Sequence, residues 1–147
     1  MKYLLLALVA IAGAGIPIQV AANKRMDEAV HSPALATTLA FVVGAAVMAV
    51  FSLTGVLGRG SLSGVNSAPW WAWLGGALSV TVVLVSVIAL PKAGAECTIA
   101  ATVVGQLIAA AVIDHFGWLG VERQPLNISR IVATILLVAG AFLLQRK

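Results

Sequence analysis

The sequence predicts an all-α integral membrane protein with five transmembrane helices. The first observation is composition: the 147 residues are 61% hydrophobic and only 10% charged, whereas a soluble domain carries about a quarter charged residues. The second is that the apolar residues form continuous runs of roughly membrane-crossing length, about 20 residues each. The third is that these runs do not alternate with polar residues, as the strands of a transmembrane barrel do. The lipid bilayer is therefore an expected partner.

The predicted spans belong to one domain and are joined by short polar or small-residue connections. They cover residues 3–22, 34–57, 70–90, 96–116 and 128–144 of the single domain 1–147. Pro17 cannot donate a backbone hydrogen bond, so we expect a kink or hinge there. Residues 23–33 are expected to form a polar connection, with Ser32-Pro33 starting the second helix. Pro91 is expected to stop the third span.

The basic residues are divided almost evenly between the two sides of the membrane. One side holds four of them and the other five: Lys2, Arg59, Arg123 and Arg130 against Lys24, Arg25, Lys92, Arg146 and Lys147. An excess of Lys and Arg on the cytoplasmic side normally sets orientation. Either one loop dominates, or copies insert both ways and pair as an antiparallel homodimer. That pair would be a ten-helix inverted repeat, an arrangement that many secondary transporters use.

Several short motifs, taken in order, resemble those of a known family. They are Pro17-Ile18-Gln19 with Asn23, Pro69-Trp70-Trp71 with Leu74-Gly75-Gly76, Gly105-Gln106, Asp114-His115-Phe116-Gly117 and the following Arg130. Over about residues 13–147 the sequence resembles the YdcZ-type family of bacterial inner-membrane proteins. That family was long catalogued as a domain of unknown function and is grouped with the drug/metabolite transporter superfamily. The resemblance implies a multi-pass inner-membrane protein that is half of a ten-helix transporter.

The sequence bears on three classes of function. The leading hypothesis is a small dual-topology secondary transporter that moves a small organic molecule as an antiparallel homodimer. The alternative is a non-transporting accessory or scaffold membrane protein. An enzyme is not expected, because the sequence has no metalloprotease motif, no nucleophile elbow and no paired carboxylates at membrane depth. No nucleotide-binding loop is present, so ATP-driven transport by this chain alone is not expected. With one cysteine and basic residues only at span ends, we expect no cofactor, metal or nucleic acid.

Three amides are candidate substrate ligands, because polar groups inside a membrane are costly. Gln19 follows the Pro17 break, and Asn23 lies one turn further along the same helix. Gln106 lies near the middle of the fourth span. Each could instead form a helix–helix hydrogen bond, or in the case of Asn23 a helix cap. A transporter would bring the three amides together on a cavity, whereas a scaffold would bury them in pairs.

Trp70, Trp71 and Trp73 begin the third span. They are either an aromatic belt at the membrane interface or an aromatic wall for a flat or cationic substrate. Because three indoles lie within four residues, at least one is expected to point into the bundle.

Asp114 and Glu96 are the only acidic residues attached to a span. Asp114 with His115 could carry a proton relay coupled to transport. The favoured interpretation is structural, with Asp114 bonded to Arg130 or to a helix end. Glu96 suits the first turn of its helix, where a carboxylate complements the helix dipole.

Small residues recur at Ala101, Gly105 and Ala109, on one face of the fourth span. Such a face permits close approach of another helix. It is either a seam between two copies or a site of tight packing within one chain.

Overall fold

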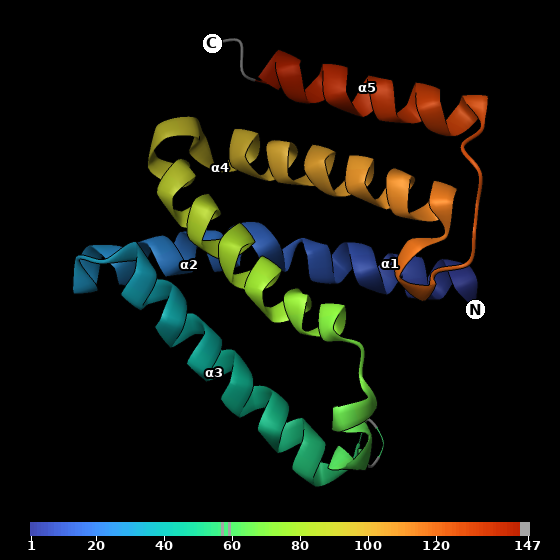
Figure 1. Cartoon of the computed structure of the whole chain (residues 1–147). Helices are drawn as coiled ribbons and strands as arrows, with labels where there is room; N and C mark the ends of the chain where they lie inside the picture. The colour runs from blue at the N-terminus through green and yellow to red at the C-terminus, as the bar shows by residue number, and fades with distance from the viewer. Residues whose placement is uncertain (57, 59, 145–147) are drawn as a thin grey trace. The chain divides into compact units, whose positions relative to one another are not determined.

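A computed structural model describes residues 1–56, 58 and 60–144, whose regular structure is helical (Figure 1). The chain divides into two compact units. We call Ile18–Ile88 the central unit, and Met1–Pro17 together with Ala89–Lys147 the terminal unit. Residues 57, 59, 146 and 147, which enter the predicted spans or the charge count, lie outside the described residues.

The first helical segment consists of α1 (Lys2–Gly13) and α2 (Gly15–Val30), interrupted only at Ala14. Pro17 lies in the first turn of α2. Its missing N–H leaves the Gly13 carbonyl without its intrahelical donor. The interruption therefore falls in the segment where the sequence predicts a kink, and hinge motion at Pro17 stays a prediction.

The prediction of a polar connection over residues 23–33 is wrong for residues 23–30, which continue α2. The charged residues there stabilise the helix because they pair along it. Each pair has the i,i+3 spacing that brings side chains together on a helix surface. The ion pairs are Lys24–Asp27 at 2.6 Å and Arg25–Glu28 at 3.0 Å.

The helix α3 (Pro33–Thr54) begins as the sequence predicts. The Ser32 hydroxyl accepts a hydrogen bond from the Leu35 N–H at 3.2 Å, and proline occupies the first helical position. The helix ends at Gly55, whose φ of 65° is the left-handed conformation that glycine adopts without strain.

Two short 3-10 helices, η1 (Leu62–Ser67) and η2 (Trp70–Trp73), lead into α4 (Leu74–Phe116). The prediction that Pro91 stops the third span is wrong, because helical structure continues past Pro91 to a kink at Gly94. A proline removes one backbone hydrogen bond, whereas Gly94 leaves helical geometry altogether with φ 78° and ψ 165°. The break therefore lies at the end of the predicted Pro91–Gly94 loop.

In the terminal unit, the part of α4 after Gly94 and α5 (Ile128–Leu144) are antiparallel neighbours (Figure 1). At one end the Cys97 thiol donates to the Leu144 carbonyl at 3.2 Å. At the other end Arg130 contacts Asp114. The turn between them contains η3 (Trp118–Gly120). The α5 bounds match the predicted fifth span, but its crossing of a membrane stays a prediction.

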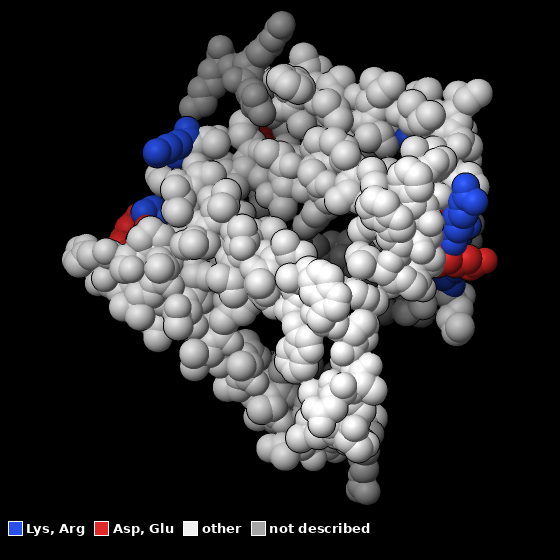
Figure 2. Space-filling view, viewed as in Figure 1, with Lys and Arg blue, Asp and Glu red and all other residues white. Residues whose placement is uncertain are grey.

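Three helical stretches within the described residues are long and apolar enough to cross a membrane: Lys2–Val30, Pro33–Thr54 and Trp70–Phe116. The helix Ile128–Leu144 is apolar but shorter. Most of the visible surface is uncharged (Figure 2). The 47 residues of Trp70–Phe116 would form a straight helix of about 70 Å, twice the roughly 30 Å hydrocarbon core. Two crossings joined at Gly94 would fit that thickness.

Replacing Gly94 by alanine should destabilise the protein, because its positive φ strains any residue with a Cβ. We expect Gly94→Ala to lower the free energy of unfolding by about 1–3 kcal/mol. The measurement is unfolding by sodium dodecyl sulfate in mixed micelles, followed by circular dichroism. Gly44→Ala is the matched control: Gly44 lies inside α3, and a Cβ there meets nothing within 4 Å. It should be neutral or slightly stabilising. Equal effects at both positions would contradict this account of the kink.

Candidate functional site

One face of α2, in the central unit, is buried. Val20, Asn23 and Asp27 are all buried, at 4, 7 and 8% exposure. Their i, i+3, i+7 spacing places them on one side of the helix. Gln19 is exposed and lies at the edge of this face. Of the two candidate amides on α2, Asn23 is therefore buried and Gln19 is not.

Two buried polar atoms of the central unit have no hydrogen-bond partner among the described residues. They are Asn23 Nδ2 and Thr37 Oγ1. Leaving a buried donor or acceptor unpaired costs about 1–3 kcal/mol. Such groups are uncommon in folded proteins, and those that persist often mark a functional position. Asn23 was a candidate from the sequence, whereas Thr37 was not.

Asp27, which the sequence did not single out as a candidate, is an ionisable residue on the same face of α2. Its carboxylate is nearly buried and accepts from the Lys24 ammonium at 2.6 Å. Asp27 was assigned to a polar connection, so its helical spacing from Asn23 was not considered. Extending the helical wheel of residues 3–22 by two turns would have placed both residues on one face.

A groove of about 410 Å³ lies between α3 and the first part of α4, within the central unit. We call it the α3–α4 groove. The volume lies in the range of roughly 300–1,000 Å³ typical of small-molecule sites. Its lining residues are Ala34, Thr37, Thr38, Phe41, Val42 and Ala45 from α3, and Val80 and Leu84 from α4. The lining is uncharged. Thr37 lies toward one end of the groove, and its unpartnered hydroxyl is buried.

The three tryptophans of η2 are all exposed. Trp71 is the least exposed, at 37%. In a 3-10 helix residues three apart lie above one another, so Trp70 and Trp73 share a side that Trp71 does not. The expectation that at least one indole points into the bundle is not met by the single chain. Three exposed indoles are compatible with an aromatic belt at the membrane interface, while a substrate-binding role of these tryptophans stays a prediction.

In the terminal unit, Arg130 ties the end of α4 to the start of α5. Its guanidinium donates to Asp114 Oδ2 at 3.3 Å, to Gln124 Oε1 at 2.9 Å and to the Gln124 carbonyl at 3.1 Å. The Gln124 backbone N–H donates a hydrogen bond to the Asp114 carbonyl at 2.7 Å. This contact fits the structural role favoured for Asp114 from the sequence, and a coupling role of Asp114 stays a prediction.

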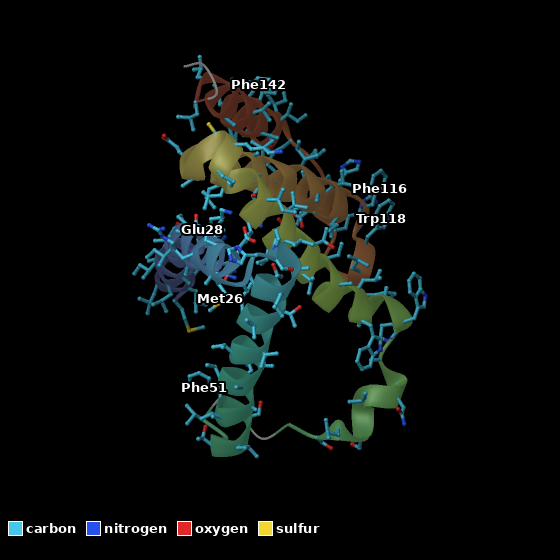
Figure 3. The ribbon with its side chains drawn as sticks, turned by 90° about the vertical axis from the view of Figure 1, so that its left-hand side faces the viewer. Met26, Glu28, Phe51, Phe116, Trp118 and Phe142 are labelled. Atoms are coloured by element: carbon cyan, nitrogen blue, oxygen red, sulfur yellow. The ribbon has the colours of Figure 1, made fainter. Side chains whose placement is uncertain are left out.

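The neighbouring contacts close the same turn. His115 Nδ1 accepts from the Leu126 N–H at 3.2 Å, and the His115 carbonyl accepts from Arg123 Nε at 3.0 Å. Phe116 and Trp118 stack with ring centroids 5.1 Å apart (Figure 3). Across the described residues, no group of three or more His, Cys, Asp or Glu is placed to hold a metal ion.

A scan against protein-family models matches residues 4–143 to DMT_YdcZ, described as "Putative inner membrane exporter, YdcZ". The chain belongs to this family. The comparisons with curated proteins and with solved structures found no match. Membership, together with the long apolar helices, makes the chain an inner-membrane protein and a membrane transporter.

In this YdcZ-family chain the three predicted amides are divided between the units. Gln19 and Asn23 belong to the central unit and Gln106 to the terminal unit. Gln19 and Gln106 are exposed, whereas Asn23 is buried. Their convergence on a cavity stays a prediction. Glu96 is also exposed, two residues after the Gly94 kink.

The Arg130 cluster predicts that lysine cannot replace this arginine. A lysine keeps the charge but cannot span Asp114 and Gln124 with a planar fork of donors. We expect Arg130→Lys to lower the free energy of unfolding by about 1–2 kcal/mol, measured by the same detergent titration. Arg25→Lys is the control, because the exposed Arg25–Glu28 pair should contribute only a few tenths of a kcal/mol. Retention of full stability in Arg130→Lys would show that the cluster does not hold the turn.

Proposed function

We propose that this chain is a dual-topology secondary transporter, in which two oppositely oriented copies form a ten-helix inverted repeat. The pair moves a small organic molecule across the inner membrane. The family description supports transport, and the nearly even distribution of basic residues supports insertion in both orientations. Inverted repeats give a transporter two equivalent faces that alternate around a site near the membrane centre.

The main support for a homodimer is the small-residue face of α4. Ala101, Gly105 and Ala109 are exposed on one side of the helix. Within the terminal unit, a Cβ added at Gly105 would meet nothing within 4 Å. The lack of a close neighbour there supports a seam between two copies. A helix of a second copy would fit against Gly105.

The exposed amides point to the same conclusion. Gln19 and Gln106 lie in segments predicted to cross the membrane, where an amide in contact with lipid is costly. A second copy, or a substrate pathway between two copies, would satisfy them. Asn23 and the tryptophans Trp70, Trp71 and Trp73 are the other proposed substrate contacts.

Cross-linking distinguishes an antiparallel pair from a parallel one. When two α4 helices cross at Gly105 in opposite directions, Ala101 of one copy faces Ala109 of the other. Cys97 is the only cysteine, so a Cys97→Ser background allows single cysteines to be placed. We expect Ala101→Cys mixed with Ala109→Cys to cross-link in native membranes at least several-fold more than either variant alone.

The control is Gly105→Leu, which should abolish the cross-link by blocking close approach of the helices. A parallel dimer would show the reverse pattern, with each single variant cross-linking to itself. Absence of any cross-link, together with a C-terminal tag accessible from one side only, would refute the antiparallel homodimer.

A further inference from the structure

We infer that the α3–α4 groove binds an uncharged amphipathic molecule whose hydrogen-bonding head group bonds Thr37 and whose apolar body lies toward Ala45. This inference names the substrate class of the proposed transporter and rests on that proposed function. It is carried by three features of the groove: an unused hydroxyl, a one-sided distribution of polar groups and the lack of charge in its lining.

The unused hydroxyl is unusual among the buried hydroxyls of this chain. Ser86 and Thr98 are also buried, and each donates to the carbonyl four residues earlier, at 2.8 and 2.7 Å. Thr37 is 2% exposed and its hydroxyl makes no such bond. The adjacent Thr38, which shares the groove, donates to the Ala34 carbonyl at 2.9 Å. Thr37 therefore keeps both a donor and an acceptor for another group.

Polar groups occur at one end of the groove only. Thr37 and Thr38 lie near the start of α3, and from Phe41 onwards the α3 lining is apolar. Val80 and Leu84 complete the apolar part from α4. A molecule with one polar end and an apolar body matches this distribution. Because Thr37 lines the groove, rotation about its χ1 between staggered positions would present the hydroxyl to that polar end.

The lack of charge excludes a simple cation as the preferred ligand. The described lining contains neither Asp nor Glu, and the nearly buried Asp27 is already paired with Lys24. Burying an uncompensated charge in an apolar site is strongly unfavourable. A neutral head group that donates and accepts hydrogen bonds could pair with the Thr37 hydroxyl without the free-energy cost of burying a charge.

The test uses 1-naphthol and naphthalene, which share an apolar body and differ by one hydroxyl. Binding to the full chain in lipid nanodiscs is measured by equilibrium dialysis, with empty nanodiscs correcting for partition into lipid. We expect saturable binding of 1-naphthol, tighter than naphthalene by roughly 3- to 10-fold, the effect of one neutral hydrogen bond. A naphthyl trimethylammonium ion should bind more weakly than 1-naphthol.

Thr37→Val should abolish the preference for 1-naphthol while keeping the shape of the side chain. Its melting temperature should be unchanged or higher, because the variant removes an unpaired buried hydroxyl. Thr38→Val is the control and should keep the preference, since the Thr38 hydroxyl is already used. Thr37→Ser should restore most of it. A preference that survives Thr37→Val, or tighter binding of the cation, would overturn the inference.

A second pair of variants tests the position of the apolar body. Ala45→Phe fills the groove and should abolish binding of both naphthalene compounds, whereas Ala46→Phe, one residue outside the lining, should not. If Ala45→Phe instead eliminates the cross-link between Ala101→Cys and Ala109→Cys, a second copy covers the groove and the inference is wrong. Binding that does not saturate would mean that lipid tails occupy the groove, which also overturns it. The cross-link between Ala101→Cys and Ala109→Cys with Ala45 retained is measured independently of these outcomes, so the proposed function is judged separately.

Discussion

In the hydrocarbon core of a membrane, each backbone N–H and C=O must find its partner within the protein, because no water is present. The rest of this structure depends on that constraint. Nearly every described residue outside the turns is helical, and the two long helical segments are interrupted only where proline or glycine permits it. The interruptions near Pro17 and at Gly94 lie close to the boundaries between the central and terminal units. The chain thus passes from one unit to the other near positions where proline or glycine weakens the hydrogen bonding of the helix backbone.

The same constraint explains which side-chain polar groups carry information. Most helical hydroxyls, such as those of Ser86 and Thr98, donate to the preceding turn and are satisfied locally. The Arg130 cluster satisfies Asp114 and Gln124 where the chain turns. Asn23 and Thr37 differ because they are buried without a partner. An unpaired buried group of this kind is available to a bound molecule, as proposed above for Thr37.

Sequence patterns were sufficient for the helical class, the start of α3 and the bounds of α5, because long apolar runs and the Ser32-Pro33 cap are local signals. They failed at residues 23–30, where a charged stretch was interpreted as a connection although its ion pairs stabilise a helix. They also could not separate Thr37 from Thr38. Neighbouring threonines look alike in sequence, and only tertiary packing decides which hydroxyl is buried without a partner. The roles of Gln19, Gln106 and the tryptophans depend on surfaces that a second copy would complete, so one chain cannot fix them.

The central unit is one continuous segment, whereas the terminal unit joins the two ends of the chain. During synthesis the central unit is complete once Ile88 has been added. The neighbours of α1 in its own unit are made afterwards, ending with α5. At about 5–20 residues per second, that delay is roughly 3–11 seconds. Over that time α1 lacks the later helices of its own unit, and its almost uncharged sequence tolerates contact with lipid. Helix α1 is therefore packed within its own unit only after the central unit has been made.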